Sequence, residues 1–269
     1  MTAKWKVLQD PEHGARWDSL RGPSGREWLW SRPDRLRYGV VPGQPFVDVG
    51  GLEECFPTIG GEPDHGEVWA RSWRESLGDG WLSCEAPAGR LNRRVSASAR
   101  GVACDYRLDA EAARPFVWAM HLLLTPDVGV QMEAPDGAAM LAFPAHGPAV
   151  PAQWPTFEDL DFSVLGEDDG SAMFVLLPDL RTLTVRDGED TLRITLDAPD
   201  EQPTGFGVWR NLGGYPWDGS PTYRNFGIEP MIGRDFDLFR ALASPQPSQP
   251  MTGIVPASGH LEWSVHLAS

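Results

Sequence analysis

The sequence contains no apolar run close to the ~20 residues that a membrane-spanning helix needs, so no such helix is expected. Its first residues, Met1 to Val7, lack the apolar core of a secretory signal, which predicts a cytoplasmic protein. Cysteine is scarce as well. Cys55, Cys84 and Cys104 are odd in number and show no C-x-x-C spacing, so we expect reduced, buried thiols and no disulfides.

The familiar motifs of metal, nucleophilic and nucleotide chemistry are also missing. His65-Gly66-Glu67 has the H-x-E spacing of zinc deaminases, but its P-C-x-x-C partner is absent, and so is H-E-x-x-H. No G-x-S-x-G occurs, and the glycine pair Gly213-Gly214 lacks a phosphate-loop lysine. These gaps disfavour a catalytic metal, a serine hydrolase and a nucleotide site, and we expect no cofactor.

Positive charge is in short supply, because 23 lysines and arginines face 38 acidic residues and leave a net charge of −15. Such acidity disfavours nucleic acid or an anionic membrane surface as the main partner. The composition, 41% apolar and 23% charged, is typical of a soluble globular protein. At 269 residues the chain can bury a sizeable core, and an all-β chain of this length is often one domain.

Helical signal is weak, whereas 29 glycines and 25 prolines predict many turns. Residues 181–186 and 191–196 alternate on either side of Asp187-Gly188, which is a strong hairpin signal. Residues 260–267 alternate as cleanly and place His260 and His266 on the polar face. Further elements are expected as strands at 92–100, 102–108 and 173–177, a two-turn helix at 236–243 and a surface loop at 244–250. We therefore predict a single all-β domain over residues 1–269, built from two large packed antiparallel sheets.

Three titratable residues lie in or beside apolar strands and could form an acid/base set without a nucleophile. Glu229 is flanked by apolar residues, and burial there would raise its pKa and make it a proton acceptor. His65 and His121 have similar surroundings. Structural roles are open for each: His65 could cap a loop, His121 could be a satisfied core histidine, and Glu229 could pair with Arg224 or Arg234.

Twelve tryptophans suggest a carbohydrate ligand, since indole faces pack on the C–H faces of sugar rings. Trp69 and Trp73 near His65, and Trp209 and Trp217 around the 213–214 loop, are the expected groove residues. Another set is expected in the core or at sheet edges, namely Trp5, Trp28, Trp30 and Trp263. The turn-rich region 134–160, with His146, Trp154 and Glu158, is a possible groove wall.

Three stretches resemble motifs of the aldose 1-epimerase superfamily, the galactose mutarotase-like proteins. Pro63-Asp64-His65-Gly66-Glu67-Val68-Trp69 looks like the family's first histidine motif. His121, followed by Leu122-Leu123-Leu124, occupies the place of the second histidine. Residues 209–214, followed by Phe226-Gly227-Ile228-Glu229-Pro230, resemble the late glutamate motif of shorter members. The resemblance runs from about residue 20 to the C-terminus.

The resemblance implies a β-supersandwich with a sugar groove across one sheet. It implies that Glu229 is the general base, His121 the general acid, and His65 a binder of the ring oxygen or a hydroxyl. Arg71 stands in for an Asn-Arg motif that is missing ahead of the first histidine, and Arg210 joins the binding set. The expected partner is a small-molecule carbohydrate, and the expected state is a monomer or homodimer.

Two other functions stay open at this point. One is carbohydrate binding without catalysis, suggested by the tryptophans and the missing arginine motif. The other is a lyase or isomerase acting on an acidic or phosphorylated sugar, which would need Arg71, Arg74 and Arg210 to gather at the site.

Overall fold

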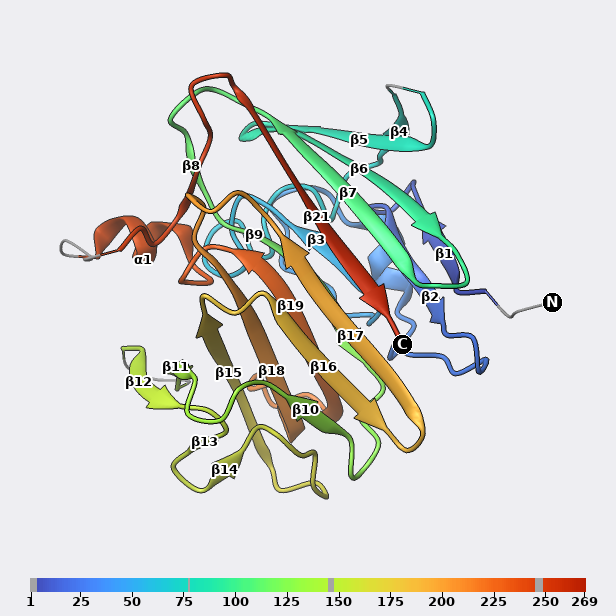
Figure 1. Ribbon diagram of the computed structural model, residues 1–269, viewed down its shortest axis with the longest axis vertical. Coiled ribbons are helices and arrows are strands. Elements are labelled where there is room, and N and C mark those ends of the chain that lie inside the picture. Colours follow the sequence, from blue (N-terminus) through green and yellow to red (C-terminus); the bar gives the residue numbers. More distant parts are fainter. Residues whose placement is uncertain (1–3, 77, 145–147, 245–248) are drawn as a thin grey trace.

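Two large antiparallel β-sheets dominate the computed structural model, which describes residues 4–76, 78–144, 148–244 and 249–269 (Figure 1). The larger sheet runs from edge to edge through β1 (Lys6–Asp10), β2 (Arg16–Arg21), β3 (Leu52–Cys55), β9 (Trp118–Leu124), β19 (Tyr223–Ile232), β18 (Thr204–Tyr215), β15 (Ser171–Pro178), β11 (Ala139–Phe143), β12 (Val150–Gln153), β13 (Thr156–Phe157) and β14 (Leu160–Asp161). The smaller sheet runs through β10 (Gln131–Glu133), β16 (Thr182–Asp187), β17 (Asp190–Asp197), β21 (His260–Ala268), β7 (Val102–Asp109), β6 (Gly89–Ala97), β5 (Trp81–Ala86) and β4 (Arg74–Glu75). The remaining elements are the two-stranded sheet of β8 (Pro115–Phe116) and β20 (Gly253–Ile254), the 3₁₀ helix η1 (Arg35–Gly39) and the helix α1 (Leu238–Ala243).

The main hydrophobic core lies between the two sheets. In Figure 1, β7, β21, β17 and β16 of the smaller sheet run across the front of the central strands of the larger one. Alternate residues of both sheets fill the space between them, such as Leu192 and Ile194 on one side and Leu122 and Ile228 on the other. The prediction of an all-β sandwich of large antiparallel sheets is confirmed.

The strands expected from alternation are present. β16 and β17 form the hairpin around Asp187-Gly188, with their apolar residues fully buried. β6 and β7 pair antiparallel and are joined by a turn that contains Gly101. There φ is +156°, and an added Cβ would lie 2.2 Å from the Leu267 carbonyl oxygen, so a side chain would not fit. On β21 the even–odd alternation leaves His260 and His266 exposed, as predicted.

A fully buried ion pair joins the two sheets. Arg93 of β6 donates to Glu54 of β3 over 2.7 Å, and neither side chain has any exposed area. Glu54 also accepts hydrogen bonds from the Tyr106 hydroxyl, at 2.8 Å, and from Trp118 Nε1, at 3.0 Å. The carboxylate is thus held by three donors, which is the condition under which a buried charge is tolerated.

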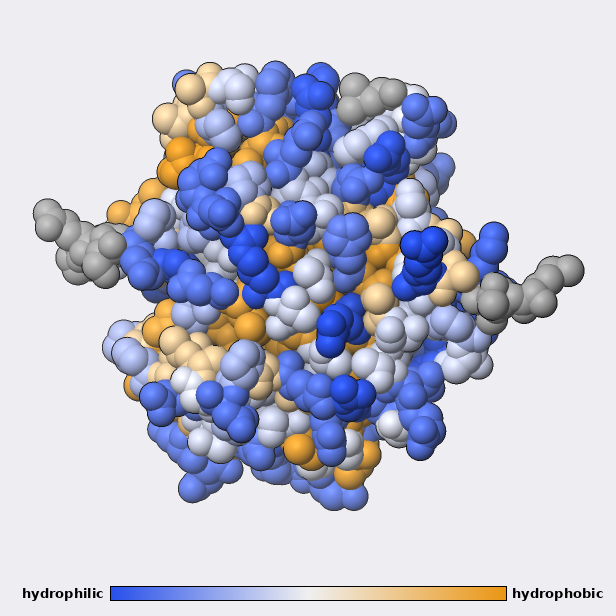
Figure 2. All heavy atoms as spheres, viewed as in Figure 1, coloured by the Kyte–Doolittle hydropathy of each residue, from blue (hydrophilic) through white to orange (hydrophobic). Residues whose placement is uncertain are grey.

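The surface seen in Figure 2 is mainly hydrophilic, with hydrophobic residues showing mostly towards the middle of that face.

The helix expected at 236–243 is present as the shorter α1. It begins after Asp237, and the Asp237 carboxylate caps the N–H groups of Phe239 and Arg240. Within the described ranges, no helix has the length and apolarity to cross a membrane. Most of the expected surface loop at 244–250 lies outside the described residues.

Candidate active site

Strand alternation sends the predicted acid/base residues to the outer face of the larger sheet. On β9, Met120 and Leu122 point into the core between the sheets, so His121 points the other way. On β19, Ile228 belongs to the same core, and Glu229 therefore shares the outer face with His121. Each strand therefore has one apolar face in the core and one outer face, and the ionisable residue lies on the outer face.

Strand register brings His121 and Glu229 together. The pairs Ile228–Leu122 and Met231–Ala119 bracket the position at which Glu229 lies opposite His121. His121 Nε2 is 3.6 Å from Glu229 Oε1. Both side chains are almost buried, with 9% and 2% of their area exposed, and the distance allows a proton to pass between them after a small movement.

His65 reaches the same place from the loop that follows β3. Its φ of +58° lies in the left-handed region, which histidine tolerates better than most residues. The imidazole stacks on Phe46, with centroids 3.6 Å apart, and its Nδ1 is 2.8 Å from an Asp64 carboxylate oxygen. The ring of His121 meets it edge to face at 5.0 Å. Asp64 therefore fixes the orientation of His65, which faces the His121–Glu229 pair.

These three residues line one cavity of about 380 Å³, at the small end of the usual range for small-molecule pockets. Its walls combine a few polar groups with many aromatic and aliphatic side chains. The lining residues are Phe46, Asp48, Ile59, Gly60, His65, His121, Leu123, Phe143, Pro144, Met173, Phe174, Trp209, Tyr215, Trp217, Glu229, Phe236 and Arg240.

Burial moves the two central groups towards their neutral forms. Loss of solvent raises the pKa of Glu229 to about 8. Burial, together with the nearby His65, lowers the pKa of His121 well below 6.5. Among the described residues, neither Glu229 Oε2 nor His121 Nδ1 has a hydrogen-bond partner. Two buried groups with opposite pKa shifts and spare hydrogen-bonding capacity are typical of a site that binds a polar ligand.

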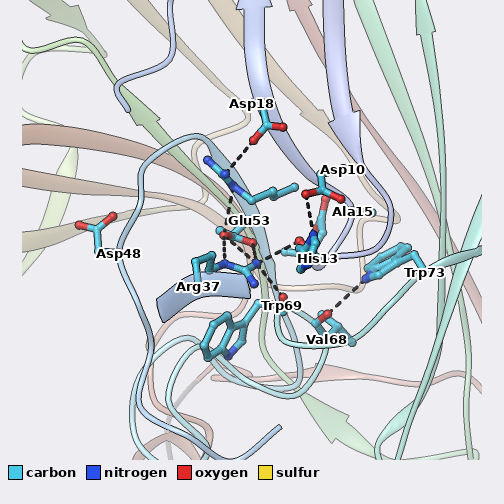
Figure 3. Close-up of polar contacts among 12 residues, drawn as sticks. Asp10, His13, Ala15, Asp18, Arg37, Asp48, Glu53, Val68, Trp69 and Trp73 are labelled. Atoms are coloured by element: carbon cyan, nitrogen blue, oxygen red, sulfur yellow. Dashed lines mark hydrogen bonds and ion pairs between the residues drawn. The ribbon is translucent and has the colours of Figure 1, made fainter. Parts of the chain in front are cut away.

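A second buried carboxylate, Glu53, lies beside the pair. It is the register partner of His121 on β3, so it shares the outer face of the sheet. Arg37 of η1 binds both of its oxygens, at 3.0 Å each, and also donates to the Trp69 carbonyl, as Figure 3 shows. Burial raises the pKa of Glu53 to about 7, against the opposing effect of Arg37 and Arg16. Arg37 therefore connects η1 and the backbone of Trp69 to β3, at the position next to His121.

An aromatic wall closes another side of the cavity. Trp209 of β18, Tyr215 and Trp217 meet edge to face, with centroid separations of 5.1–6.2 Å. Trp209 is anchored by a hydrogen bond from its Nε1 to Asn225, whereas Trp217 is 60% exposed. Two of the predicted groove tryptophans, Trp209 and Trp217, therefore lie where a ligand would meet them.

The other predicted binding residues lie outside the cavity. Trp69 is fully buried and packs edge to face behind Phe46, and Trp73 is buried with its Nε1 bonded to the Val68 carbonyl. The side chain of Arg71 is held by the Glu67 carbonyl. Trp69 is therefore a support for the ring that stacks on His65.

Arg210 is also directed away. It lies next to Trp209 on β18, so alternation turns it to the opposite face, where it pairs with Asp169 at 2.5 Å. Arg74 lines a separate surface hollow with Arg71. The cluster of Arg71, Arg74 and Arg210 that an acidic or phosphorylated sugar would require does not form at this cavity.

The structural alternative for Glu229 does not apply to the described residues. Arg224 pairs with Asp168 and Arg234 with Asp179, and neither reaches Glu229. Residues 134–160 were expected to form a wall of the groove. Phe143 and Pro144 of this region line the cavity, whereas Trp154 is buried in the core. His146 lies outside the described residues.

Several lining residues were not expected from the sequence. Phe46 and Asp48 belong to an irregular segment without any pattern, and Phe236 and Arg240 precede or belong to a short helix. Glu53, which lies beside the lining, gave no comparable signal, because a second acid, Glu54, follows it directly in the segment from Leu52 to Phe56. Across the described ranges, no three metal-ligating side chains of His, Cys, Asp or Glu come close enough to hold an ion.

Comparison with known proteins adds likeness of fold. No protein-family model and no curated protein matches the sequence. Solved structures do match over nearly the whole chain. One, provisionally named an aldose 1-epimerase, from Escherichia coli K12, has 13% identity and a TM-score of 0.69, and 100% of this chain and 98% of that chain are covered.

Two further structures give the same result. A galactose mutarotase-like protein from Lactobacillus casei has 16% identity and a TM-score of 0.60, with coverage of 100% and 98% of the two chains. A protein from Salmonella typhimurium, provisionally named a mutarotase, has 14% identity and a TM-score of 0.55, with coverage of 100% and 92%. At these identities the likeness is one of fold.

Proposed function

Because the chain has the galactose mutarotase-like fold, we propose that it interconverts the α and β anomers of a sugar, as an aldose 1-epimerase does. The observation that carries the proposal is the buried contact of 3.6 Å between His121 and Glu229 inside a cavity of monosaccharide size. A sugar is also suited to the aromatic wall of Trp209 and Trp217, since indole faces pack on sugar C–H groups.

The reaction requires one base and one acid. Glu229 takes the proton from the hydroxyl on C1 while His121 protonates the ring oxygen, so the C1–O5 bond breaks and an open-chain aldehyde forms. Rotation about the C1–C2 bond presents the other face of the carbonyl. The groups then reverse roles, and the ring closes to the opposite anomer. Each well-placed group typically contributes about 10²–10⁴-fold.

The pKa shifts define how many protons the pair holds. Near neutral pH, the raised pKa of Glu229 and the lowered pKa of His121 leave one acidic proton in the pair, on the carboxyl group. Moving that proton to His121 gives a carboxylate base and an imidazolium acid. Hydroxyl groups of a bound sugar favour this ionised form by donating to Glu229, since hydrogen bonds to a carboxylate lower its pKa.

We expect the catalysed rate to fall as pH rises through about 8. Glu229 then loses the proton that the pair needs, because burial raises its pKa to about 8. At lower pH the rate should stay constant until His121 becomes protonated in addition to Glu229. Because the pKa of His121 is lowered, this happens well below pH 6.5. The measurement is kcat/KM for anomer exchange by NMR from pH 5 to 9.5, with spontaneous exchange subtracted. A catalysed rate that rises from pH 7 to 9 would contradict this proton count.

Replacing Trp217 by Ala is expected to raise KM by about 2- to 10-fold with little change in kcat, since one aromatic packing contact contributes about 0.5–1.5 kcal/mol. Trp217 lines the cavity and is 60% exposed, so its loss leaves the core intact. Phe239→Ala is the matched control, because Phe239 is equally exposed but lies outside the cavity lining. An unchanged KM in Trp217→Ala would remove this residue from the binding wall.

A second candidate function is sugar binding without catalysis. It is favoured by the absence of Arg71 and Arg210 from the cavity lining, since the binding set inferred from the family motifs is then incomplete. NMR exchange spectroscopy with glucose and galactose separates the two functions. Faster exchange between anomers supports an epimerase, whereas saturable binding shifts at the spontaneous rate support a binding protein.

A further inference from the structure

One end of the cavity is formed by three phenylalanines. Phe143, Phe174 and Phe236, which we call the aromatic box, contact one another with ring centroids 4.9, 5.2 and 5.6 Å apart. Phe143 and Phe174 are register partners on β11 and β15, and Phe236 comes from the segment before α1. All three rings line the cavity, so the box offers ring surface to whatever enters it.

Two glycines allow the box to lie directly against the backbone. A Cβ at Gly60 would lie 2.5 Å from the Phe236 ring, and one at Gly207 would lie 2.5 Å from Phe174. Gly207 is the register partner of Glu229. The Phe174 ring therefore covers the strand next to that of Glu229. Neighbouring strands are about 4.8 Å apart, which is less than the length of one sugar ring.

Polar groups with free hydrogen-bonding capacity lie next to the box, because Gly207, which packs against Phe174, is the register partner of Glu229. In the described part of the chain, Glu229 Oε2 and His121 Nδ1 have no hydrogen-bond partner. Arg240, the cation nearest the box, stacks over Phe143 and Phe236 at 5.1 and 4.4 Å, and its Nε is bonded to Asp235 at 2.8 Å. The three phenylalanine rings can neither accept nor donate a hydrogen bond to a sugar hydroxyl, and Nε and Nη2 of Arg240 are already bonded to Asp235.

The charges of the lining point to a neutral ligand. Asp48 is acidic, and the only arginine among the described lining residues, Arg240, is paired with Asp235. A phosphate or a sugar carboxylate would meet the acidic Asp48 and an arginine that already pairs with Asp235, so an uncharged ligand is favoured.

We propose, given the anomerase function above, that the preferred substrate is a deoxy sugar: an uncharged monosaccharide that carries hydrogen in place of a hydroxyl, or methyl in place of hydroxymethyl. Its apolar carbon lies in the aromatic box, and its anomeric centre lies between Glu229 and His121. A hydroxyl placed against the three rings instead would lose its water without gaining a hydrogen bond from them. Discrimination of about 10- to 100-fold against the parent sugar follows, since apolar pockets reject an added hydroxyl only to that extent.

The test compares matched sugars with the full-length protein. Exchange rates and dissociation constants are measured by NMR for D-glucose, 2-deoxy-D-glucose, 6-deoxy-D-glucose and D-glucose 6-phosphate, and for D-galactose and 6-deoxy-D-galactose. We expect at least one deoxy sugar to exceed its parent by about 10-fold or more in kcat/KM, and the phosphate to be the poorest substrate. Parents that match or exceed every deoxy sugar would overturn the inference.

The binding constants separate this inference from the proposed function. Tighter binding of a deoxy sugar without faster exchange would support the box and refute the epimerase. Faster exchange of all neutral sugars alike would support the epimerase and refute the box. Binding of none of the sugars would count against both.

Phe236→Tyr tests the box itself, because it adds one hydroxyl to the half-buried ring on Gly60. It should lower the ratio of kcat/KM between deoxy and parent sugar by about 10-fold, since a sugar hydroxyl would then find a partner. Phe239→Tyr makes the same change on an exposed ring outside the cavity and should leave the ratio unchanged. Equal ratios in both variants and the wild type, with unchanged thermal unfolding, would refute the role of the box.

Discussion

Replacing Glu229 by Gln is expected to lower the rate of anomer exchange by about 10²-fold or more at pH 7, because the amide can neither hold nor accept the proton that the reaction moves. Gln has nearly the shape of Glu, Glu229 is 2% exposed, and no arginine of the described ranges pairs with it, so the fold should be unaffected. The measurement is NMR exchange between anomers at saturating sugar. Glu262→Gln, on the exposed face of β21, is the control and should keep the full rate.

The same variant should be more stable than the wild type at high pH. The folded-state pKa of Glu229 is about 8, above the 4.5 of the unfolded chain, so folding retains a proton and stability is lost as pH rises through that interval. Gln is not affected by this titration. At pH 9 we expect the free energy of unfolding of Glu229→Gln to exceed that of the wild type by about 2–4 kcal/mol. At pH 5 the difference should be smaller.

Denaturant unfolding at both pH values measures this effect directly. A gain in stability at pH 9 together with a lost rate would show that the buried carboxylate is retained for its chemistry. A rate that survives the substitution would refute Glu229 as the base. A loss of stability would mean that the carboxylate has a structural partner, contrary to its unpaired Oε2.

Replacing Arg93 by Met is expected to have the largest effect on stability, a loss of about 3–5 kcal/mol, because it leaves a charged Glu54 buried without its cation. Arg93 and Glu54 have no exposed area, and Arg93 also donates to Gln9 over 2.9 Å. The remaining donors to Glu54, the Tyr106 hydroxyl and the Trp118 indole, are neutral and cannot balance the charge. The free energy of unfolding in urea is the measurement.

A second substitution and a control make this result specific. The double variant Arg93→Met, Glu54→Gln should recover part of the loss, since the uncompensated charge is removed. Arg90→Met breaks an ion pair with Glu85 whose side chains are 48% and 68% exposed, and it should cost less than about 1 kcal/mol. Equal losses in Arg90→Met and Arg93→Met would contradict the dependence on burial.

Local patterns were sufficient to predict much of the fold. The hairpin of β16 and β17 follows from alternation around Asp187-Gly188, and the exposed His260 and His266 follow from the polar phase of β21. These features depend on contacts within a strand or between neighbours in sequence. The same local argument found Glu229 and His121, because an ionisable residue in an apolar strand stands out in a short window.

The residues missed or misplaced depend on distant pairings. The aromatic box forms only when β11 and β15 are in register and the segment before α1 folds back beside Gly60. Trp69 and Trp73 were expected in the groove because they are near His65 in sequence, but their rings are buried. Nearness in sequence does not fix the direction of a side chain in a loop, whereas in a strand it does.

The position of His121 and Glu229 at the centre of the larger sheet has a consequence for how the gene can change. β9 is paired on both sides, with β3 and with β19, so its register cannot shift alone. Insertion of one codon within β9 or β19 would turn His121 or Glu229 towards the core and bring an apolar neighbour into the cavity. The segments carrying Phe46, Trp217 and Phe236 lie outside these strands and can vary in length without such an inversion. Evolution of this scaffold can therefore alter the walls of the cavity through the loops, while the reading frame of two strands keeps His121 and Glu229 in place.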